Sequence, residues 1–440
     1  MPRKTLASLA FLIFNLPIVA EAQAPSGMPA SPPTLIRAGR LVDVKSGRVL
    51  EDRGILVEGD RIAAVGAYDE VRSRAPGTTT FVDLSKATIL PGLIDAHTHV
   101  LLQGDVTQAD YDEQILKESI PFRTIRATVA ARTAVNHGFT TIRDLETEGA
   151  MYADVDLKRA IERGIIPGPR MFCATRAFAP TGMYPVFGYS WELKMPEGVQ
   201  IVDGADAIRK AVREQVKYGA DWIKFYSDRK YYMKDGALHS WVNFTREEMA
   251  AMVQEAHRLD RRVAAHAMGR EGIEAALEAG VDTIEHGNGL TEPLIDRMIA
   301  QKVYWCPTIY VGVFVADGRG KLWQEMRDVE AKAFGLAVRK GVKIAYGTDV
   351  GGYPWTENQA KEFAYMVKYG MTPMQAIRSA TVVAAELLQA EETLGAIEPG
   401  KHADIVATAG DPLADVSELE RIKFVMKAGA VVRDDLSKLP

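Results

Sequence analysis

Residues 90–99, Leu-Pro-Gly-Leu-Ile-Asp-Ala-His-Thr-His, form an apolar run that ends in two histidines one residue apart. Because side chains alternate along a strand, His97 and His99 would project from one face at the strand's carboxyl end. Neutral imidazoles bind Zn, Cu, Fe and Ni, so the pair predicts a metal site. The same spacing also arises by coincidence at strand ends, so the rest of the sequence has to decide.

A recurring sequence pattern, a glycine followed by a short apolar run, predicts the architecture. Gly138, Gly219, Gly280 and Gly341 each stand where a helix would end and a short strand begin, and the last three are 61 residues apart. This spacing gives eight candidate strands, which end near His97, Asp144, Thr175, Lys224, His266, His286, Thr308 and Asp349. Eight βα units are typical of a (β/α)8 TIM barrel, an α/β fold. A doubly wound open sheet is the alternative, but no Gly-x-Gly-x-x-Gly follows the first strand.

Both ends of the chain differ from this middle part, residues 88–398, which would form the barrel. Residues 25–87 and 399–440 contain short β-rich runs, which predict hairpins rather than helices and a small β-sandwich module built from both ends. Residues 1–24 combine two basic residues, an apolar run and small residues, which is typical of a secretory signal peptide. A membrane anchor is the alternative, but the apolar run is too short.

Composition and charge narrow the function classes. The signal peptide predicts an exported protein, periplasmic or secreted, with no membrane association after cleavage. A net charge of -5 with mixed signs gives no reason to expect nucleic acid as a partner. The chain has two cysteines, Cys173 and Cys306, and each lies in an apolar segment, so we expect buried free thiols.

Residue types able to bind metal gather at the predicted strand ends. Six of the eight ends carry one, and four of the chain's eight histidines fall there. Barrels of this kind place their chemistry at the carboxyl ends of the strands, so these side chains would meet at one mouth. They are His97, His99, Asp144, Lys224, His266, His286 and Asp349. The other four histidines are expected to be structural or solvated, with His239 in a polar loop.

Lys224 needs a separate explanation because an ammonium group has no lone pair to offer a metal. It lies within Trp-Ile-Lys-Phe-Tyr, residues 222–226, where burial would lower its pKa and expose a neutral amine. A neutral amine can add carbon dioxide to give a carbamate, an anion able to bridge two cations. The alternative is a buried lysine paired with Asp144 or Asp349, and the strand position alone does not separate the two.

These motifs resemble the metal-dependent amidohydrolase superfamily, in the branch with a carboxylated lysine and two divalent metal ions. The resemblance rests on residues 90–99 together with Lys224, Ala-Ala-His266, Ile-Glu-His286-Gly and Tyr-Gly-Thr-Asp349, and the β-rich ends extend it over nearly all of the chain after the leader. It also implies a homo-oligomer, up to an octamer.

The resemblance implies a role for each ligand. The buried metal would be held by His97, His99 and Asp349, and the exposed one by His266 and His286. The carboxylated Lys224 would bind both, and zinc is the expected metal. Asp349 would also be the general base, taking the proton of a hydroxide that bridges the metals and passing it to the leaving nitrogen.

Within the superfamily the chain resembles Xaa-Pro dipeptidase-like, imidazolonepropionase-like and ochratoxin-hydrolysing members. This implies carboxypeptidase-like hydrolysis of a small-molecule amide that releases an amino acid, with a dipeptide, an N-acyl amino acid or ochratoxin A as substrate. Tyr226 shares the inward face of Lys224 and is therefore a candidate substrate contact. Arg143 is a weaker candidate.

Other functions stay open at this stage. Mononuclear deaminases of the superfamily usually carry a glutamate three residues after the fifth-strand histidine, whereas Ala267, Met268 and Gly269 follow His266. Deamination of a heterocycle is therefore disfavoured, and release of ammonia instead of an amino acid would identify it. Cyclic-amide hydrolysis is a further alternative. A catalytically inactive barrel that acts as a binding protein is the last, and the intact ligand set argues against it.

Overall fold

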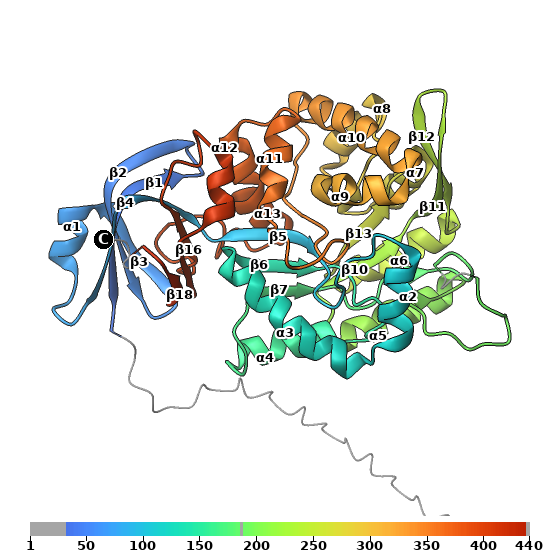
Figure 1. Cartoon of the computed structure of the whole chain (residues 1–440), viewed down its shortest axis with the longest axis horizontal. Coiled ribbons are helices and arrows are strands. Elements are labelled where there is room, and N and C mark those ends of the chain that lie inside the picture. Colours follow the sequence, from blue (N-terminus) through green and yellow to red (C-terminus); the bar gives the residue numbers. More distant parts are fainter. Residues whose placement is uncertain (1–31, 185–187, 437–440) are drawn as a thin grey trace, which may run out of the picture.

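The structure is a computed structural model of the chain, and it describes residues 32–184 and 188–436. The predicted signal peptide, residues 1–24, lies outside the described residues. None of the helices in the described ranges is long and apolar enough to cross a membrane. The described chain consists of a seven-stranded β sheet at one end and a larger α/β body beside it (Figure 1).

Parallel strands form the centre of the α/β body. Three of them make up the sheet β5-β6-β7, and four more lie side by side in a second sheet in the order β15-β14-β13-β10. Their bounds are Leu93–Thr98 (β5), Phe139–Asp144 (β6), Arg170–Cys173 (β7), Trp222–Tyr226 (β10), Arg262–Ala267 (β13), Thr283–His286 (β14) and Tyr304–Cys306 (β15). Each strand ends within two residues of a predicted end, and glycines of the repeat precede β6, β10 and β14.

Backbone hydrogen bonds join the two sheets into a barrel-like arrangement. On one side the N–H of Asp221 donates to the carbonyl of Cys173 at 2.8 Å, which links β10 to β7. On the other side, residues 343–346 take the place of the eighth strand of the barrel. The N–H of Ala345 donates to Trp305 at 2.9 Å, and the N–H of Ala96 donates to Tyr346 at 2.9 Å. The predicted α/β fold of the TIM-barrel type is confirmed.

Helices follow the strands and cover the outside of this barrel (Figure 1). Thr245 caps α6 through a capping box with Glu248. Gly219, Gly280 and Gly341 end α5, α7 and α10 in the left-handed conformation that glycine adopts without strain. The helices are α2 (Gln108–Lys117), α3 (Ile120–Asn136), α4 (Ala153–Glu162), α5 (Ala205–Tyr218), α6 (Arg246–Arg258), α7 (Arg270–Ala279), α8 (Glu292–Gln301), α9 (Ile309–Arg319), α10 (Lys321–Lys340), α11 (Lys361–Lys368), α12 (Pro373–Arg378) and α13 (Ala384–Leu387).

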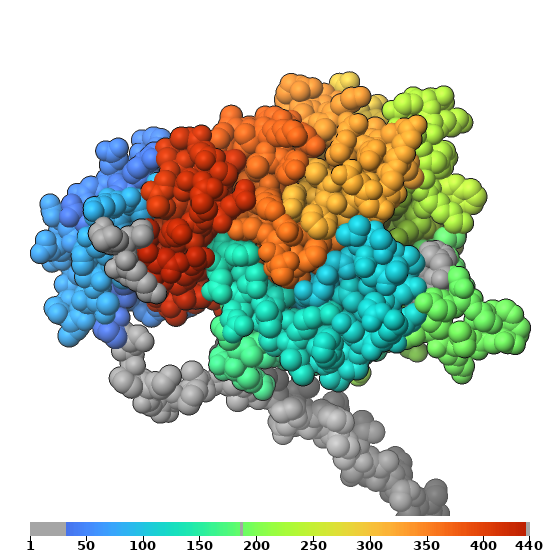
Figure 2. All heavy atoms as spheres, in the orientation of Figure 1, coloured from blue at the N-terminus to red at the C-terminus, as the bar shows by residue number. Residues whose placement is uncertain are grey.

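Both ends of the chain contribute strands to the seven-stranded sheet, in the order β18-β17-β16-β4-β1-β2-β3. Figure 2 shows the blue N-terminal strands packed against red C-terminal segments. The prediction of hairpins without helices is wrong at α1 (Tyr68–Arg74), where Tyr68 and Val71 bury one face of a short helix against the sheet. The strands are β1 (Thr34–Asp43), β2 (Arg48–Glu58), β3 (Arg61–Ala67), β4 (Thr80–Pro91), β16 (Ile405–Thr408), β17 (Phe424–Lys427) and β18 (Ala430–Asp434).

Gly92 is the point where the chain passes from this sheet into the barrel, between β4 and β5. Its N–H donates to the carbonyl of Asp404 at 2.8 Å, and a Cβ at this position would lie 2.2 Å from Thr140 Oγ1. A side chain would push the neighbouring strands apart, so only glycine fits. The close approach sets the position of β5, which carries His97.

A two-stranded hairpin, β11 (Asp228–Lys234) and β12 (Ala237–Val242), follows β10 at the end of the molecule away from the seven-stranded sheet (Figure 1). The prediction that His239 lies in a loop is wrong, since it is part of β12 and its Nδ1 lies 2.7 Å from Glu271 Oε1. The prediction for the cysteines is confirmed: Cys173 and Cys306 are free and buried. Two short strands, β8 (Phe178–Ala179) and β9 (Gln200–Ile201), complete the sheet beside β10.

Candidate metal centre and active site

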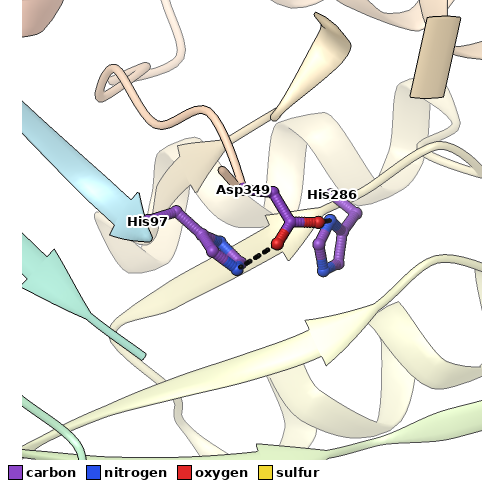
Figure 3. Close-up of side chains that lie close together, drawn as sticks. All are labelled: His97, His286 and Asp349. Carbon is purple, nitrogen blue, oxygen red and sulfur yellow. Dashed lines mark ion pairs between the residues drawn. The ribbon is translucent and has the colours of Figure 1, made fainter. Parts of the chain in front are cut away.

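Predicted ligands from opposite sides of the barrel meet at one end of it. Ligand atoms of His97, His286 and Asp349 all lie within 4.8 Å of one another (Figure 3). His97 Nε2 is 3.5 Å from Asp349 Oδ1, and His286 Nδ1 is 4.0 Å from Asp349 Oδ2. His99 joins them, since its Nε2 is 3.0 Å from Asp349 Oδ1 and 3.3 Å from His97 Nε2. Four residues from three distant parts of the sequence therefore form one donor cluster.

The backbone at two of these residues adopts an uncommon conformation. Asp349 and His286 have φ angles of 57° and 70°, in the left-handed region that residues other than glycine seldom enter. The N–H of Asp349 donates to the carbonyl of His97 at 2.8 Å. This hydrogen bond fixes the segment that follows residues 343–346 against β5. Such strained residues cluster at functional sites, where the surrounding structure compensates the strain.

Buried charged groups below the cluster orient His97. Glu285 Oε2 lies 2.8 Å from His97 Nδ1, which directs the Nε2 of the same ring toward Asp349. The guanidinium of Arg143 donates to Glu285 Oε1 at 2.8 Å and to the carbonyl of Ala96 at 2.6 Å. Arg143 is completely buried and is absent from the described residues that line the cavity above. Arg143 is therefore placed to hold Glu285 in position, and this geometry does not favour the predicted contact with a substrate.

The electrostatics of the cluster favour an ionised Asp349. Burial raises the pKa of this carboxyl, but the imidazoles of His97, His99 and His286 outweigh burial and hold its pKa below the ordinary value. Burial lowers the pKa of His97 to about 4, and Lys224 adds to this effect. For His99, the carboxylates of Asp349, Glu148 and Glu146 outweigh burial and raise the pKa to about 10. A cation bound by His99 would displace that proton.

Lys224 lies in the same cavity on β10, and only 1% of its surface is exposed. Burial lowers the pKa of its amine, although Glu285, Glu146 and Asp349 partly oppose the shift. The alternative of an ion pair with Asp144 or Asp349 is not realised, because within the described residues no carboxylate oxygen forms an ion pair with Nζ. Asp144 instead accepts the N–H of Val100 at 2.8 Å and lies outside the cavity lining that the structure describes.

His266, at the end of β13, completes the predicted set. Its ring centroid is 4.5 Å from that of His286, and burial, with smaller contributions from the neighbouring His286 and Arg229, lowers its pKa well below the ordinary value. The Nε2 of His266 lies 2.7 Å from the hydroxyl of Tyr231, a residue of the β11 strand. A cation bound through this nitrogen would therefore take the place of the Tyr231 hydroxyl.

A cavity of about 560 Å³ opens above these residues. His97, His99, Lys224, His266, His286 and Asp349 all line it. Apolar side chains, among them Leu102, Met183, Val311 and Trp323, form other parts of its wall. Tyr226 also lines it, but its hydroxyl already donates to Glu146 Oε2 at 2.5 Å, so this predicted substrate contact is engaged within the protein. The cavity is large enough for a small organic molecule.

Several residues of this site were missed by the sequence analysis. Glu285 directly precedes His286 in a buried strand, where a carboxylate without a partner would be costly, so its position alone signalled a partner. Glu146 and Glu148 follow β6 and lie with His99 in a second group of possible ligand atoms within 4.8 Å of one another. Arg229 follows β10 and lines the cavity.

The donor set fits divalent cations. Imidazole nitrogens and carboxylate oxygens that point at a common centre are the ligands of zinc in proteins, and catalytic sites add an open position for substrate. The glutamate on His97 Nδ1 is the partner that commonly orients a metal-binding imidazole. Lys224 fits the set only as a carbamate, because its ammonium form would repel a cation.

Comparisons with known proteins show which family the chain belongs to. The sequence profile of the "Amidohydrolase family" matches residues 88–432, and that of the "Imidazolonepropionase-like composite domain, bacteria" matches residues 54–77. The chain is 29% identical to an ochratoxinase of Aspergillus niger over 424 residues, which cover 89% of this chain and 84% of that protein. It is 25% identical to an imidazolonepropionase of Streptomyces avermitilis, over 81% of this chain and 80% of that protein.

Solved structures extend the similarity to three dimensions. A Xaa-Pro dipeptidase with bound methionine in its active site superposes with a TM-score of 0.79 and 34% identity, covering 91% of this chain and all of that one. The ochratoxinase of Aspergillus niger superposes with a TM-score of 0.77 and 27% identity, covering 92% of this chain and 96% of the other. The family match spans the whole barrel, and a relative above 30% identity spans nearly the whole described chain. The chain belongs to the amidohydrolase family, and it is a hydrolase that acts on amide bonds.

Proposed function

We propose that this chain is a binuclear metal-dependent amidohydrolase that cleaves an amide bond and releases an amino acid. The observation that carries the proposal is the convergence of His97, His99, His286 and Asp349 at the floor of a cavity that Lys224 and His266 also line. Similarity to a Xaa-Pro dipeptidase and an ochratoxinase supports an amino acid as the leaving group. The substrate is accordingly a dipeptide, an N-acyl amino acid or an ochratoxin A type amide.

Two divalent cations, with zinc the expected metal, would polarise the scissile carbonyl and make a nucleophilic water available at neutral pH. His97, His99 and Asp349 would hold one of them, and His266 and His286 the other. Lys224 would bind both after its neutral Nζ adds carbon dioxide, which forms an N–C bond and releases one proton. Burial of the amine, which lowers its pKa, supports this step.

Asp349 would move the proton in the reaction. Its carboxylate is ionised because the neighbouring imidazoles hold its pKa low, so it can accept a proton from the attacking water. It would then deliver the same proton to the leaving nitrogen, which must be protonated before an amine can depart. The left-handed backbone of Asp349 and its hydrogen bond to His97 would keep the carboxylate in place during both transfers.

The proposal is tested by product analysis. Purified protein loaded with zinc is incubated with a panel of dipeptides, N-acyl amino acids and ochratoxin A, and the released amines are identified by mass spectrometry. We expect a free amino acid from at least one class and no product after chelation of the metal. The absence of any free amino acid from every member of the panel would contradict the proposal.

A second candidate is hydrolysis of a cyclic amide, which the matches to imidazolonepropionase and its composite domain favour. Such a reaction opens a ring and gives one product, whereas cleavage of a linear amide gives two. Adding an imidazolone substrate to the same panel separates the two candidates, and an ammonia assay in parallel detects a deaminase.

A further inference from the structure

The guanidinium of Arg229 lines the active-site cavity in an unusual state. Arg229 is the second residue of β11, it is partly buried, and its guanidinium lies against two tyrosine rings. Its Cζ lies 4.3 Å from the ring centroid of Tyr184 and 4.7 Å from that of Tyr226. Both contacts are cation–π interactions, which stabilise the charge without using its N–H donors.

The N–H donors of Arg229 lack acceptors. Its Nε is buried and has no hydrogen-bond partner, and in the described ranges no carboxylate forms an ion pair with the guanidinium. Arg319, the other arginine of the cavity wall, is by contrast bound by Asp105 at 3.0 Å and by the carbonyl of Val106 at 3.0 Å. A guanidinium N–H that is withdrawn from water and left unpaired, as at Nε, is costly, so an acceptor supplied by a ligand is the simplest resolution.

The two tyrosines that flank Arg229 are themselves fixed. The hydroxyl of Tyr184 donates to Glu148 at 2.7 Å, and that of Tyr226 donates to Glu146 at 2.5 Å. The two hydroxyls are therefore engaged, and the two rings, whose centroids are 4.7 Å apart, contact each other as well as the guanidinium. A positioned guanidinium with free N–H groups is the group best suited to bind a carboxylate through two parallel hydrogen bonds.

Arg229 also lies close to the reaction centre. The ring of Tyr226 that contacts the guanidinium lies 4.6 Å, centroid to centroid, from His266, so one aromatic ring separates Arg229 from a proposed metal ligand. In an amide that releases an amino acid, the carboxylate of the leaving group is only two bonds from the scissile nitrogen. A carboxylate on Arg229 would thus leave the scissile bond near His266 and Asp349.

We propose that Arg229 binds the α-carboxylate of the leaving amino acid and so restricts the enzyme to amides with a free carboxyl terminus. This inference rests on the proposed function and adds the residue that selects the substrate class. Arg229 takes the role that the sequence analysis assigned to Tyr226, whose hydroxyl is bonded to Glu146, and to Arg143, which holds Glu285 and lies outside the described lining of the cavity.

The test compares matched substrates that differ only in charge. Wild type, Arg229→Gln and Arg229→Lys, each loaded with zinc, are assayed with the best substrate of the panel and with its C-terminal carboxamide. For the free acid we expect kcat/KM to fall about 100-fold in Arg229→Gln and less in Arg229→Lys, while the carboxamide changes by less than about threefold. Arg327→Gln, which removes a surface arginine paired with Asp328, is the matched control and is expected to resemble wild type.

A binding measurement separates this inference from the proposed function. Isothermal titration calorimetry measures L-methionine and L-methioninamide, which share an ammonium group and a side chain and differ in the carboxylate. Arg229→Gln should weaken methionine about 30-fold and leave methioninamide unchanged. Equal effects on both ligands and both substrates, or no effect on either, would overturn the role of Arg229. A wild type that binds methionine through Arg229 but hydrolyses no amide would contradict the proposed function alone.

Discussion

Lys224 is the residue whose chemistry most directly distinguishes the proposed binuclear site from a mononuclear one. Lys224→Ala removes the amine that would carry the carbamate, so we expect hydrolysis to fall by about 10³-fold or more. A short carboxylic acid such as propionate could enter the space left by the side chain and offer its carboxylate in place of the carbamate. Partial recovery of turnover with added propionate, followed by amine release, is the expected result.

Two further variants make this result specific. Lys224→Arg keeps a cation at the position but cannot form a carbamate at neutral pH, so it should be inactive. Lys332→Ala alters an exposed lysine far from the cavity and should behave as wild type. Full activity of Lys224→Ala without added acid would show that the site does not need a bridging anion.

Glu285 is expected to act through His97 and not on the substrate. Glu285→Gln keeps the shape of the side chain but replaces the charge that holds His97 Nδ1 and Arg143. Partners of this kind typically contribute about 10–100-fold to metal affinity, so zinc content after dialysis should drop markedly. The measurement is zinc per chain by mass spectrometry, with the surface variant Glu398→Gln as control. Unchanged zinc retention in Glu285→Gln would rule out this positioning role.

The predictability of the site differs from residue to residue. The residues at the strand ends could be predicted because the carboxyl ends of barrel strands place their side chains at one mouth, regardless of the conformation of the loops. These residues are His97, His99, His266, His286 and Asp349. Arg229 could not be singled out in this way, because its role depends on Tyr184, which arrives from a loop 45 positions earlier. Only the tertiary structure shows which donors are already bonded within the protein, and for this reason we propose Arg229 in place of Tyr226 as the substrate contact.

At the scale of single elements, helix α7 depends on a carboxylate from the neighbouring hairpin. Asp228, the first residue of β11, accepts the N–H groups of Met268 at 3.2 Å and Gly269 at 2.8 Å, just before α7 begins at Arg270. The carboxylate sits against Gly272, where an added Cβ would lie 2.2 Å from Asp228 Oδ2. Asp228 thus joins the hairpin that carries Arg229 to the start of the helix.

Gly272→Ala should therefore destabilise the protein although alanine is the better helix former. The new methyl group would displace the Asp228 carboxylate and leave N–H groups at the start of α7 without their acceptor, at a cost of about 2 kcal/mol in the free energy of unfolding. Urea unfolding followed by circular dichroism measures this change. Gly312→Ala in α9 is the control, because its Cβ would meet its nearest neighbour, Glu330 Oε2, at 3.5 Å. The control should be neutral or stabilising by up to about 1 kcal/mol, and a similar effect of both variants would contradict the Asp228 contact.

The elements themselves were predicted to different degrees. The strands β10 and β14 and residues 343–346 follow glycines that end the preceding helices, a local signal that tertiary structure does not override, and the observed strand ends agree. The β11–β12 hairpin was missed because its residues are largely polar, although Arg229, Tyr231 and Met233 alternate toward the protein with exposed residues between them. Helix α1 was missed because seven residues between two strands are too short to establish a helical period.

At the scale of the whole molecule, the chain encloses an unusual number of buried acids around and beneath the barrel. Burial is the main cause of the raised pKa of Asp105 and Asp154, each to about 7, and of Glu362, to about 8. Hydrogen bonds and neighbouring cations reduce these shifts without cancelling them. These acidic residues lie on different structural elements. The raised pKa values are therefore a property of the whole barrel and not of one site.

These pKa values determine how the stability of the metal-free protein should depend on pH. A carboxyl group has a pKa near 4 in the unfolded chain, so between that value and its raised folded value the folded state binds more protons than the unfolded state. Stability must then fall as pH rises through the folded pKa. At the lower end of the range from pH 6.5 to 8.5, the histidines whose pKa is lowered, such as His97, oppose this trend, because about half of the unfolded imidazoles are still protonated; above about pH 7.5 both states are deprotonated and they no longer contribute. Lys224, with its lowered pKa, opposes the trend at the upper end of this range but is a single group.

We therefore expect the melting temperature of chelated protein to fall by about 3–6 °C between pH 6.5 and 8.5. Differential scanning fluorimetry at three pH values in this range, with and without zinc, measures it. Zinc requires deprotonated ligands and binds more tightly as pH rises, so the loaded protein should show a smaller fall or a rise. Glu362→Gln removes one of the titrating acids and should flatten the slope of the chelated protein. A melting temperature that increases with pH after chelation would mean that the buried acids are already ionised in the folded protein, and that cations bound within the barrel are not needed to offset their charge.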